Sequence, residues 1–271
     1  MKMVKHITLG IVISLIIIGL DYTFRLSKNA EPQKLITTST IHNIEFVQIP
    51  TGEFTIFMPI TESVVGLSYI EKDVTFTKPF AISKYEITRK QWQDCTDDGI
   101  CKNAKRQRSW QTPNHPMTNI SWQDAATYAQ WLSDKTGENY RLPTEEEWLY
   151  VAHEGKPYTP KKFVDEDLLF KQDIRREETK SKGDFGANNW GVHDMNGSTT
   201  EWTLSCWRAS KGKSLEYVDT AILKDRRECG IRILQGNDRV HLPYFIKNPI
   251  GGGCSTGKVP SHVGMRLVKE L

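Results

Sequence analysis

The segment of residues 119–152 constrains the fold most, because it carries the sequence signals of two helices in close succession. Ser121 is a preferred N-cap residue, with Asp124 three positions later. Apolar residues then recur at helical spacing as far as Leu132. Gly137 is typical of the residue that ends a helix, since glycine readily adopts the left-handed conformation. These signals predict a first helix between Ser121 and Gly137.

A second helix is predicted directly after a short extended link that ends at Pro143. Proline disfavours helical geometry in the residue before it, so the first helix cannot continue through this link. Thr144 and Glu147 have the spacing of a capping box. The glutamates at positions 145–147 also suit the positive end of a helix dipole. The segment therefore predicts a helix, a link and a second helix.

The helix pair closely resembles a signature of the formylglycine-generating enzyme (sulfatase-modifying factor) domain family, written here as WxDAxxYxxWLSxKTGxxYRLPTEEEWLYVA. Further segments resemble other motifs of the family and follow the family's order: residues 46–54, 79–88, 115–122, 189–195 and 264–267. The resemblance extends over residues 44–271. It implies a single domain with an irregular α+β fold, rich in loops and built on a C-type-lectin-like core.

The first 24 residues are typical of an export signal. Lys2, Lys5 and His6 precede the uncharged apolar run of residues 7–20. This run has the length of a signal-peptide core and is shorter than the ~20 residues that span a bilayer. No small-x-small cleavage site follows, so we expect an uncleaved signal anchor, with a cleaved signal peptide as the alternative.

Either form of this segment predicts export of the domain, because the positive flank stays inside. An uncleaved anchor would hold the domain at the periplasmic face of the inner membrane. A cleaved peptide would release it to the periplasm or the medium. Residues 25–43 carry few large apolar groups and are predicted to be a linker, and residues 44–271 are predicted to form the folded domain.

The charge of the chain does not indicate a nucleic-acid partner. The formal net charge is +3, with 36 Lys and Arg residues against 33 Asp and Glu residues. Nucleic-acid binding usually requires a concentrated basic face, and here the basic residues are scattered among acidic ones. We therefore expect no nucleic acid among the partners.

Five cysteines fit an oxidising compartment. Cys95 and Cys101 flank a short loop, and this spacing resembles a loop disulfide of bacterial members of the family. Cys206 and Cys229 stand at positions that resemble a second family pair. The resemblance therefore implies two disulfides and leaves Cys254 without a role. Buried thiols are the alternative for these residues.

The oxidase chemistry of the family requires a pair of cysteines that holds a copper ion, because copper(I) favours soft thiolate ligands. In the family this pair directly follows a strand and turn that correspond here to residues 232–245. That stretch contains no cysteine, and Cys254 is the only later one. One thiol cannot form a two-cysteine site. We therefore expect no copper and no catalytic residues of the family's oxidase type.

Calcium is the other ion to consider. The family's G-N-V-W-E-W turn supplies oxygen ligands, and residues 197–202 resemble that turn with its asparagine replaced. The candidate ligands are Gly197, Ser198 and Glu201, and a calcium ion takes 6 to 8 oxygens. The loss of the side-chain amide disfavours the site. We therefore expect no cofactor, and calcium at this turn is the alternative prediction.

The family scaffold without its copper thiols predicts an accessory or regulatory protein that binds an envelope protein or peptide. The resemblance implies such roles with envelope kinases and with type VI secretion. The expected binding groove lies where the family binds substrate, at Asn237, Asp238, Arg239, His241 and Tyr244.

Two alternatives remain open. The first is an enzyme in the same groove, either a formylglycine-generating oxidoreductase or one with altered chemistry that uses Cys254, His241 or Asp238. The second is a carbohydrate-binding lectin, which rests on fold analogy alone.

Overall fold

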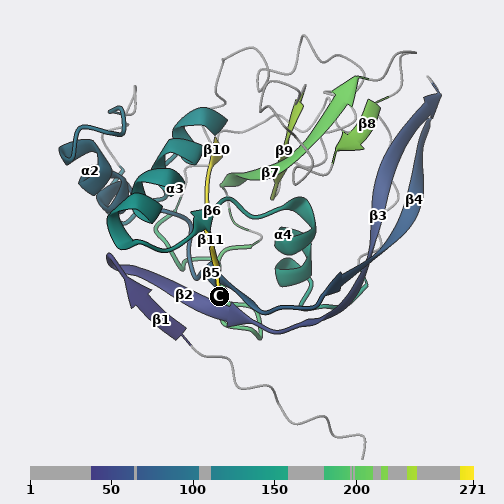
Figure 1. Ribbon diagram of the computed structural model, residues 1–271, viewed down its shortest axis with the longest axis horizontal. Coiled ribbons are helices and arrows are strands. Elements are labelled where there is room, and N and C mark those ends of the chain that lie inside the picture. The colour runs from purple at the N-terminus through teal and green to yellow at the C-terminus, as the bar shows by residue number, and fades with distance from the viewer. Residues whose placement is uncertain are drawn as a thin grey trace, which may run out of the picture. The chain divides into compact units, whose positions relative to one another are not determined.

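The computed structural model describes residues 38–63, 66–103, 111–157, 180–195, 197, 199–209, 215–218, 231–236 and 263–271 (Figure 1). All of them belong to one compact unit, Ile36–Leu271. The predicted export signal of residues 1–24 lies outside the described residues. Among the described helices, none combines the length and the apolar character that a membrane crossing requires.

A five-stranded antiparallel sheet brings the two ends of the domain together. Its spatial order is β1 (Thr38–Ile41), β2 (Ile44–Ile49), β5 (Phe80–Ser83), β11 (Val268–Glu270) and β6 (Tyr140–Arg141). Ile82 of β5 lies opposite both Val47 of β2 and Val268 of β11. All three side chains are fully buried. This apolar row ties the last strand of the chain to its first strands.

Strand β1 corrects the predicted linker boundary. It lies within residues 25–43 and pairs with β2 through a two-residue turn at His42 and Asn43. Both turn residues have positive φ, 47° and 59°. A two-residue hairpin turn of this kind requires positive φ at both positions, which glycine usually supplies. The sequence lacks that glycine signal, and the strand structure begins by Thr38 instead of residue 44.

A second sheet is built around the long strand β7 (Thr200–Ala209). Its neighbours are β10 (Val263–Gly264), β8 (Leu215–Val218) and β9 (Ile231–Gln235), of which only β10 runs parallel to β7. The ribbon of β3 (Gly52–Ser63) and β4 (Gly66–Phe76) forms a third sheet. Figure 1 shows helix α4 (Glu145–Ala152) between the β7 sheet and this ribbon.

The two predicted helices are confirmed, together with their caps. Helix α3 (Trp122–Thr136) begins after Ser121, which exchanges hydrogen bonds with Asp124, and ends at Gly137 with φ 75°. Helix α4 begins after Thr144, which forms the same reciprocal box with Glu147. A third capping box starts α2 (Arg89–Asp97). The mixed helix and sheet architecture predicted from the family resemblance is confirmed.

The core is rich in aromatic side chains that fix the helices to the sheets. Trp92 of α2 stacks on Tyr128 of α3, with ring centroids 5.2 Å apart. Trp202 of β7 is fully buried and donates its indole N–H to the Ile120 carbonyl over 2.9 Å. Stacked aromatic pairs contribute about 0.5–1.5 kcal/mol beyond the area that they bury. These contacts hold α2 and α3 firmly against the sheets that carry the site.

Candidate functional site

The predicted binding residues Asn237, Asp238, Arg239, His241 and Tyr244 lie outside the described residues, as does Cys254. The structure describes the strand that leads to them. Gln235 at the end of β9 is buried, and its amide donates to Glu145 Oε1 over 2.7 Å. The strand that leads to the predicted groove is thus fixed to the first turn of α4.

A buried ion pair includes Glu201, the β7 residue that lies opposite Gln235 of β9. Arg266, in the closing motif of the chain, donates from Nε to Glu201 Oε2 over 2.6 Å and from Nη2 to Glu201 Oε1 over 2.7 Å. Trp148 of α4 donates to the same Oε2 over 2.8 Å. Arg266 also donates to the backbone carbonyls of Ser83 and His193. One guanidinium therefore connects β5, β7 and the loop that carries His193.

Glu86 is a second buried carboxyl group beside this ion pair. Its Oε2 has no hydrogen-bond partner in the described part of the chain. Burial raises the pKa of Glu86, Glu201 and Asp194 raise it further, and the outcome is about 8 despite the opposing effect of Arg266. Burial in a low-dielectric site disfavours the charged form of a carboxyl group. Glu86 is therefore mainly protonated at neutral pH.

The candidate calcium ligand Glu201 is already engaged by Arg266 and Trp148. A cation there would have to compete with the full charge of a buried guanidinium. Ser198 lies outside the described residues, and the described residues contain no group of three or more His, Cys, Asp or Glu side chains arranged to hold a metal. The geometry of Glu201 does not fit the calcium hypothesis, and the Gly197 and Ser198 part of it stays a prediction.

The predicted loop disulfide between Cys95 and Cys101 is confirmed. It closes the turn that follows α2 and holds Asp98 and Ile100 in place. Cys206 is buried in β7, and its predicted partner Cys229 lies outside the described residues. The second disulfide therefore stays a prediction.

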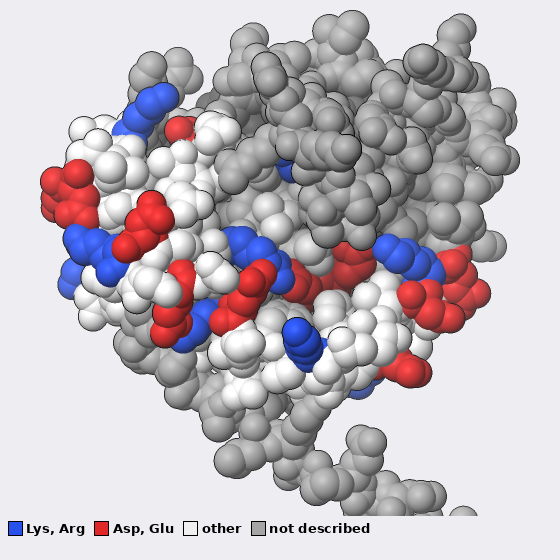
Figure 2. Space-filling view, in the orientation of Figure 1, with Lys and Arg blue, Asp and Glu red and all other residues white. Residues whose placement is uncertain are grey.

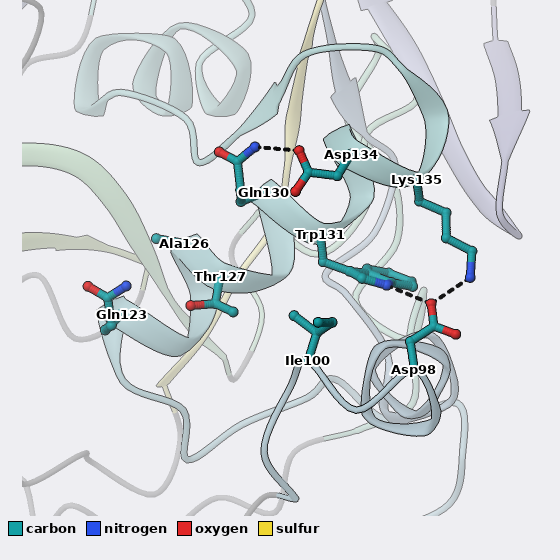
Figure 3. Close-up of a pocket in the computed structure, with 9 residues that line it drawn as sticks. All are labelled: Asp98, Ile100, Gln123, Ala126, Thr127, Gln130, Trp131, Asp134 and Lys135. Carbon is teal, nitrogen blue, oxygen red and sulfur yellow. Dashed lines mark hydrogen bonds and ion pairs between the residues drawn. The ribbon is translucent and has the colours of Figure 1, made fainter.

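The disulfide loop and α3 border an open groove of about 570 Å³ (Figure 3). Its lining residues are Asp98, Ile100, Gln123, Ala126, Thr127, Gln130, Trp131, Asp134 and Lys135. Figure 3 shows Ile100 on the loop facing the helix, with the Trp131 ring beside Asp98. A volume of this size falls within the range of ligand pockets in proteins.

One end of the groove is held rigid by a polar cluster. Asp98 Oδ2 accepts the Trp131 indole N–H over 2.8 Å and forms an ion pair with Lys135. These hydrogen bonds from Lys135 and Trp131 hold the pKa of Asp98 below its usual range. Along the rest of the groove, Gln130 donates to Asp134 over 2.8 Å. The groove thus has a preformed polar end with two carboxylates and one lysine.

Sequence reasoning did not find this groove, because its walls come from α3 and from the disulfide loop after α2, which are separate in the sequence. Two sequence signals point to it in retrospect. Ile100 is an apolar residue in an otherwise polar disulfide loop and is 54% exposed. The outer side of α3 carries Gln123, Thr127 and Gln130 in place of the long charged side chains that usually cover exposed helices.

The Sulfatase-modifying factor enzyme 1-like domain matches residues 32–271 of this sequence. The chain belongs to this family. The family resemblance predicted from the motifs is therefore confirmed, and so is the family's fold. The solved structure of PvdO from Pseudomonas aeruginosa superposes with a TM-score of 0.58 and 26% identity, covering 89% of this chain and 100% of PvdO.

Two relatives of this chain have names that describe a role. The inactive C-alpha-formylglycine-generating enzyme 2 of Bos taurus is 22% identical, over 79% of this chain and 88% of the relative. The chaperone protein LppX of Paenibacillus barcinonensis is 27% identical, over 57% of this chain and 75% of the relative. Proteins named as inactive and as a chaperone thus lie among its relatives.

Proposed function

We propose that this protein is a non-catalytic member of the family that acts by binding another protein of the cell envelope. The observation that carries the proposal is the distribution of its cysteines. Residues 232–245 contain none, although the family's copper-binding pair follows the strand and turn that correspond to them. Cys95 and Cys101 are joined in a disulfide far from that stretch in sequence.

The remaining residues do not restore a copper site on chemical grounds. Copper(I) selects soft sulfur ligands, and a two-cysteine site needs two thiolates close together. Cys254 is the single cysteine after Cys229. The residues of this chain therefore do not fit the copper ion of the oxidases, and we derive no oxidase step.

The relatives support a binding role. An inactive formylglycine-generating enzyme matches most of the chain, and the chaperone LppX matches more than half of it. The export signal expected at residues 1–24 would bring the domain to the envelope. We propose that the partner is an envelope protein or peptide, with kinase-associated and secretion-associated proteins as the first classes to test.

An oxidase assay tests the non-catalytic part of the proposal. The purified full chain, loaded with copper(I), is incubated with a cysteine-containing peptide in air, and the peptide is analysed by mass spectrometry. We expect no conversion of cysteine to formylglycine. Conversion that disappears in Cys254→Ser would establish an enzyme with altered chemistry and overturn the proposal.

Site-directed crosslinking tests the binding part. A photoreactive residue replaces His241 or Tyr244 in the predicted groove, or Asp184 on an exposed loop as the matched control. Crosslinks are formed in intact cells and identified by mass spectrometry. We expect one envelope protein to crosslink from positions 241 and 244 and to be absent from position 184. Equal patterns at the three positions would contradict a binding face there.

A further inference from the structure

A groove between α3 and the disulfide loop is lined by described residues other than those predicted to bind the partner. Its floor is apolar, with Trp131 and the partly buried Ala126. Ile100 stands at its edge with 54% of its surface exposed. Large apolar side chains at the edge of a preformed concavity are typical anchors of protein interfaces.

The apolar wall of this groove is rigid before any partner arrives. The Cys95–Cys101 disulfide closes the loop, and Asp98 in the same loop is bonded to Trp131 and Lys135 of α3. Ile100 is therefore held in place opposite α3 (Figure 3). Preorganised contacts bind more tightly because little conformational entropy is lost on association.

The charge of the groove favours a basic occupant. Asp98 is the C-cap of α2 and Asp134 stands in the last turn of α3, and both residues line the groove. Helix C-termini carry negative dipole charge, so acidic residues there are locally unfavourable. Lys135 pairs with Asp98.

Asp134, the second acidic residue of the lining, accepts its hydrogen bond from the neutral amide of Gln130. Two helix ends with acidic residues therefore meet at one end of an apolar groove. The acidic residues oppose the helix dipoles, and locally unfavourable residues of this kind are common at functional sites.

The exposed side of α3 suits a peptide chain. Gln123, Thr127 and Gln130 line the groove with short polar groups that can donate and accept hydrogen bonds. From Gln123 to Asp134 the helix rises about 16 Å, or three turns. A protein segment of a few residues spans that length. On the face shown in Figure 2, acidic and basic side chains are interspersed.

We infer that the groove between α3 and the disulfide loop binds a protein segment that carries an apolar side chain next to lysine or arginine. The apolar side chain packs on Ile100 and Trp131, and the basic group lies near Asp134. This inference rests on the proposed binding function and adds the chemistry of the partner and a second contact surface.

The test uses the full chain in detergent and three fluorescent synthetic peptides. The first carries one leucine between arginine pairs, the second replaces the leucine by glycine, and the third replaces the arginines by glutamates. Fluorescence anisotropy gives the dissociation constants. We expect the first peptide to bind about tenfold more tightly than either of the others, the size of effect usual for a binding hot spot.

Two protein variants and two matched controls locate the binding. Ile100→Ser and Asp134→Lys should each weaken binding of the first peptide about tenfold. Phe185→Ser and Asp184→Lys change an exposed apolar and an exposed acidic residue outside the groove, and should leave binding unchanged. All four positions are exposed, so the variants are expected to fold, which circular dichroism verifies.

Several outcomes would overturn the inference. They are equal binding of the three peptides, binding of none, or wild-type affinity in both groove variants. A dimer of the full chain that Ile100→Ser dissociates in sedimentation experiments would identify a second copy as the occupant and also overturn it. A negative result here, together with specific crosslinks from positions 241 and 244, would leave the proposed binding function intact.

Discussion

Arg266 and Glu201 form a two-point ion pair in the interior of the domain, with side-chain exposures of 0% and 1%. The pair joins the closing motif of the chain to strand β7. Buried charges are tolerated only when the partner and the remaining hydrogen bonds are all in place. Here the backbone carbonyls of Ser83 and His193 accept further hydrogen bonds from the guanidinium. Trp148 donates a hydrogen bond to the carboxylate.

Removing Arg266 should therefore destabilise the domain strongly. Arg266→Met leaves the Glu201 carboxylate buried without its counter-charge, and we expect the free energy of unfolding to fall by about 3–5 kcal/mol. The double variant Arg266→Met with Glu201→Gln should recover part of this loss, because no charge is then buried. Urea denaturation of the purified domain measures both values.

Lys156→Met is the matched control for this prediction. Lys156 pairs with Glu154, but its side chain is 74% exposed. Exposed ion pairs contribute about 0–1 kcal/mol, so this variant should stay close to wild type. A similar loss in the Arg266 and Lys156 variants would show that the buried pair has no special role.

The buried Glu86 carboxyl group predicts a stability that falls as the pH rises. Its ordinary pKa of 4.5 applies to the unfolded chain, and its pKa in the folded domain is about 8. Between these values the folded state binds the extra proton, so the free energy of unfolding decreases with pH, by at most about 1.4 kcal/mol per pH unit. The stability that the protonated Glu86 carboxyl group contributes is fully present below pH 4.5 and is lost above about pH 8.

Glu86→Gln tests this dependence, because the amide is neutral at every pH. We expect the variant to lose the decline between pH 4.5 and 8 and to be more stable than wild type by a few kcal/mol at about pH 9. Denaturation across this pH range measures the difference. Glu138→Gln changes an exposed carboxyl group and serves as the control. If the unfolding free energies of wild type and Glu86→Gln change with pH in parallel, the prediction is refuted.

Local signals explain how much of this fold the sequence could predict. Ser121, Thr144 and Gly137 act within one helical turn, and all three caps were found where expected. The Cys95–Cys101 pair is also local, with a sequence separation of 6. Helix caps and short loops are decided by neighbours in the chain, so they can be predicted without knowledge of the tertiary structure.

The site could be predicted less well, because its contacts join distant segments. Arg266 and Glu201 are 65 residues apart, and Gln235 and Glu145 are 90 apart. Neither pairing follows from helix or strand periodicity. The turn at His42 has no glycine to mark it, and so β1 was missed. The groove beside Ile100 depends on how two helices pack, which no motif encodes.

Gly264 in the closing motif should not tolerate a side chain. An added Cβ atom would lie 2.6 Å from the Met117 carbonyl oxygen and 2.8 Å from Thr199 Cγ2. The first of these atoms belongs to the backbone and cannot rotate away. Overpacking of this kind costs about 1–3 kcal/mol, and we expect the loss to increase from Gly264→Ala to Gly264→Val. Unfolding free energies of both variants that match wild type would contradict this close approach.

The loop disulfide should stabilise the domain by restricting its unfolded state. Cys95 and Cys101 are six residues apart, and closing a loop of this length contributes about 2 kcal/mol. The double variant Cys95→Ala with Cys101→Ala removes the link without adding polar groups to a buried site. We expect its unfolding free energy to fall by this amount, measured by chemical denaturation without reductant.

A reductant separates this link from the predicted Cys206–Cys229 pair. If that second pair forms, reductant should destabilise the Cys95→Ala, Cys101→Ala variant further, and peptide mapping without reduction should recover a fragment that joins positions 206 and 229. If reductant leaves the unfolding free energy of this variant unchanged and no such fragment is found, the prediction of a Cys206–Cys229 disulfide is wrong. Cys206 lies in β7 opposite Arg232 of β9, so a link to Cys229 would fasten β9, the strand that precedes the predicted binding residues, to the central strand of its sheet.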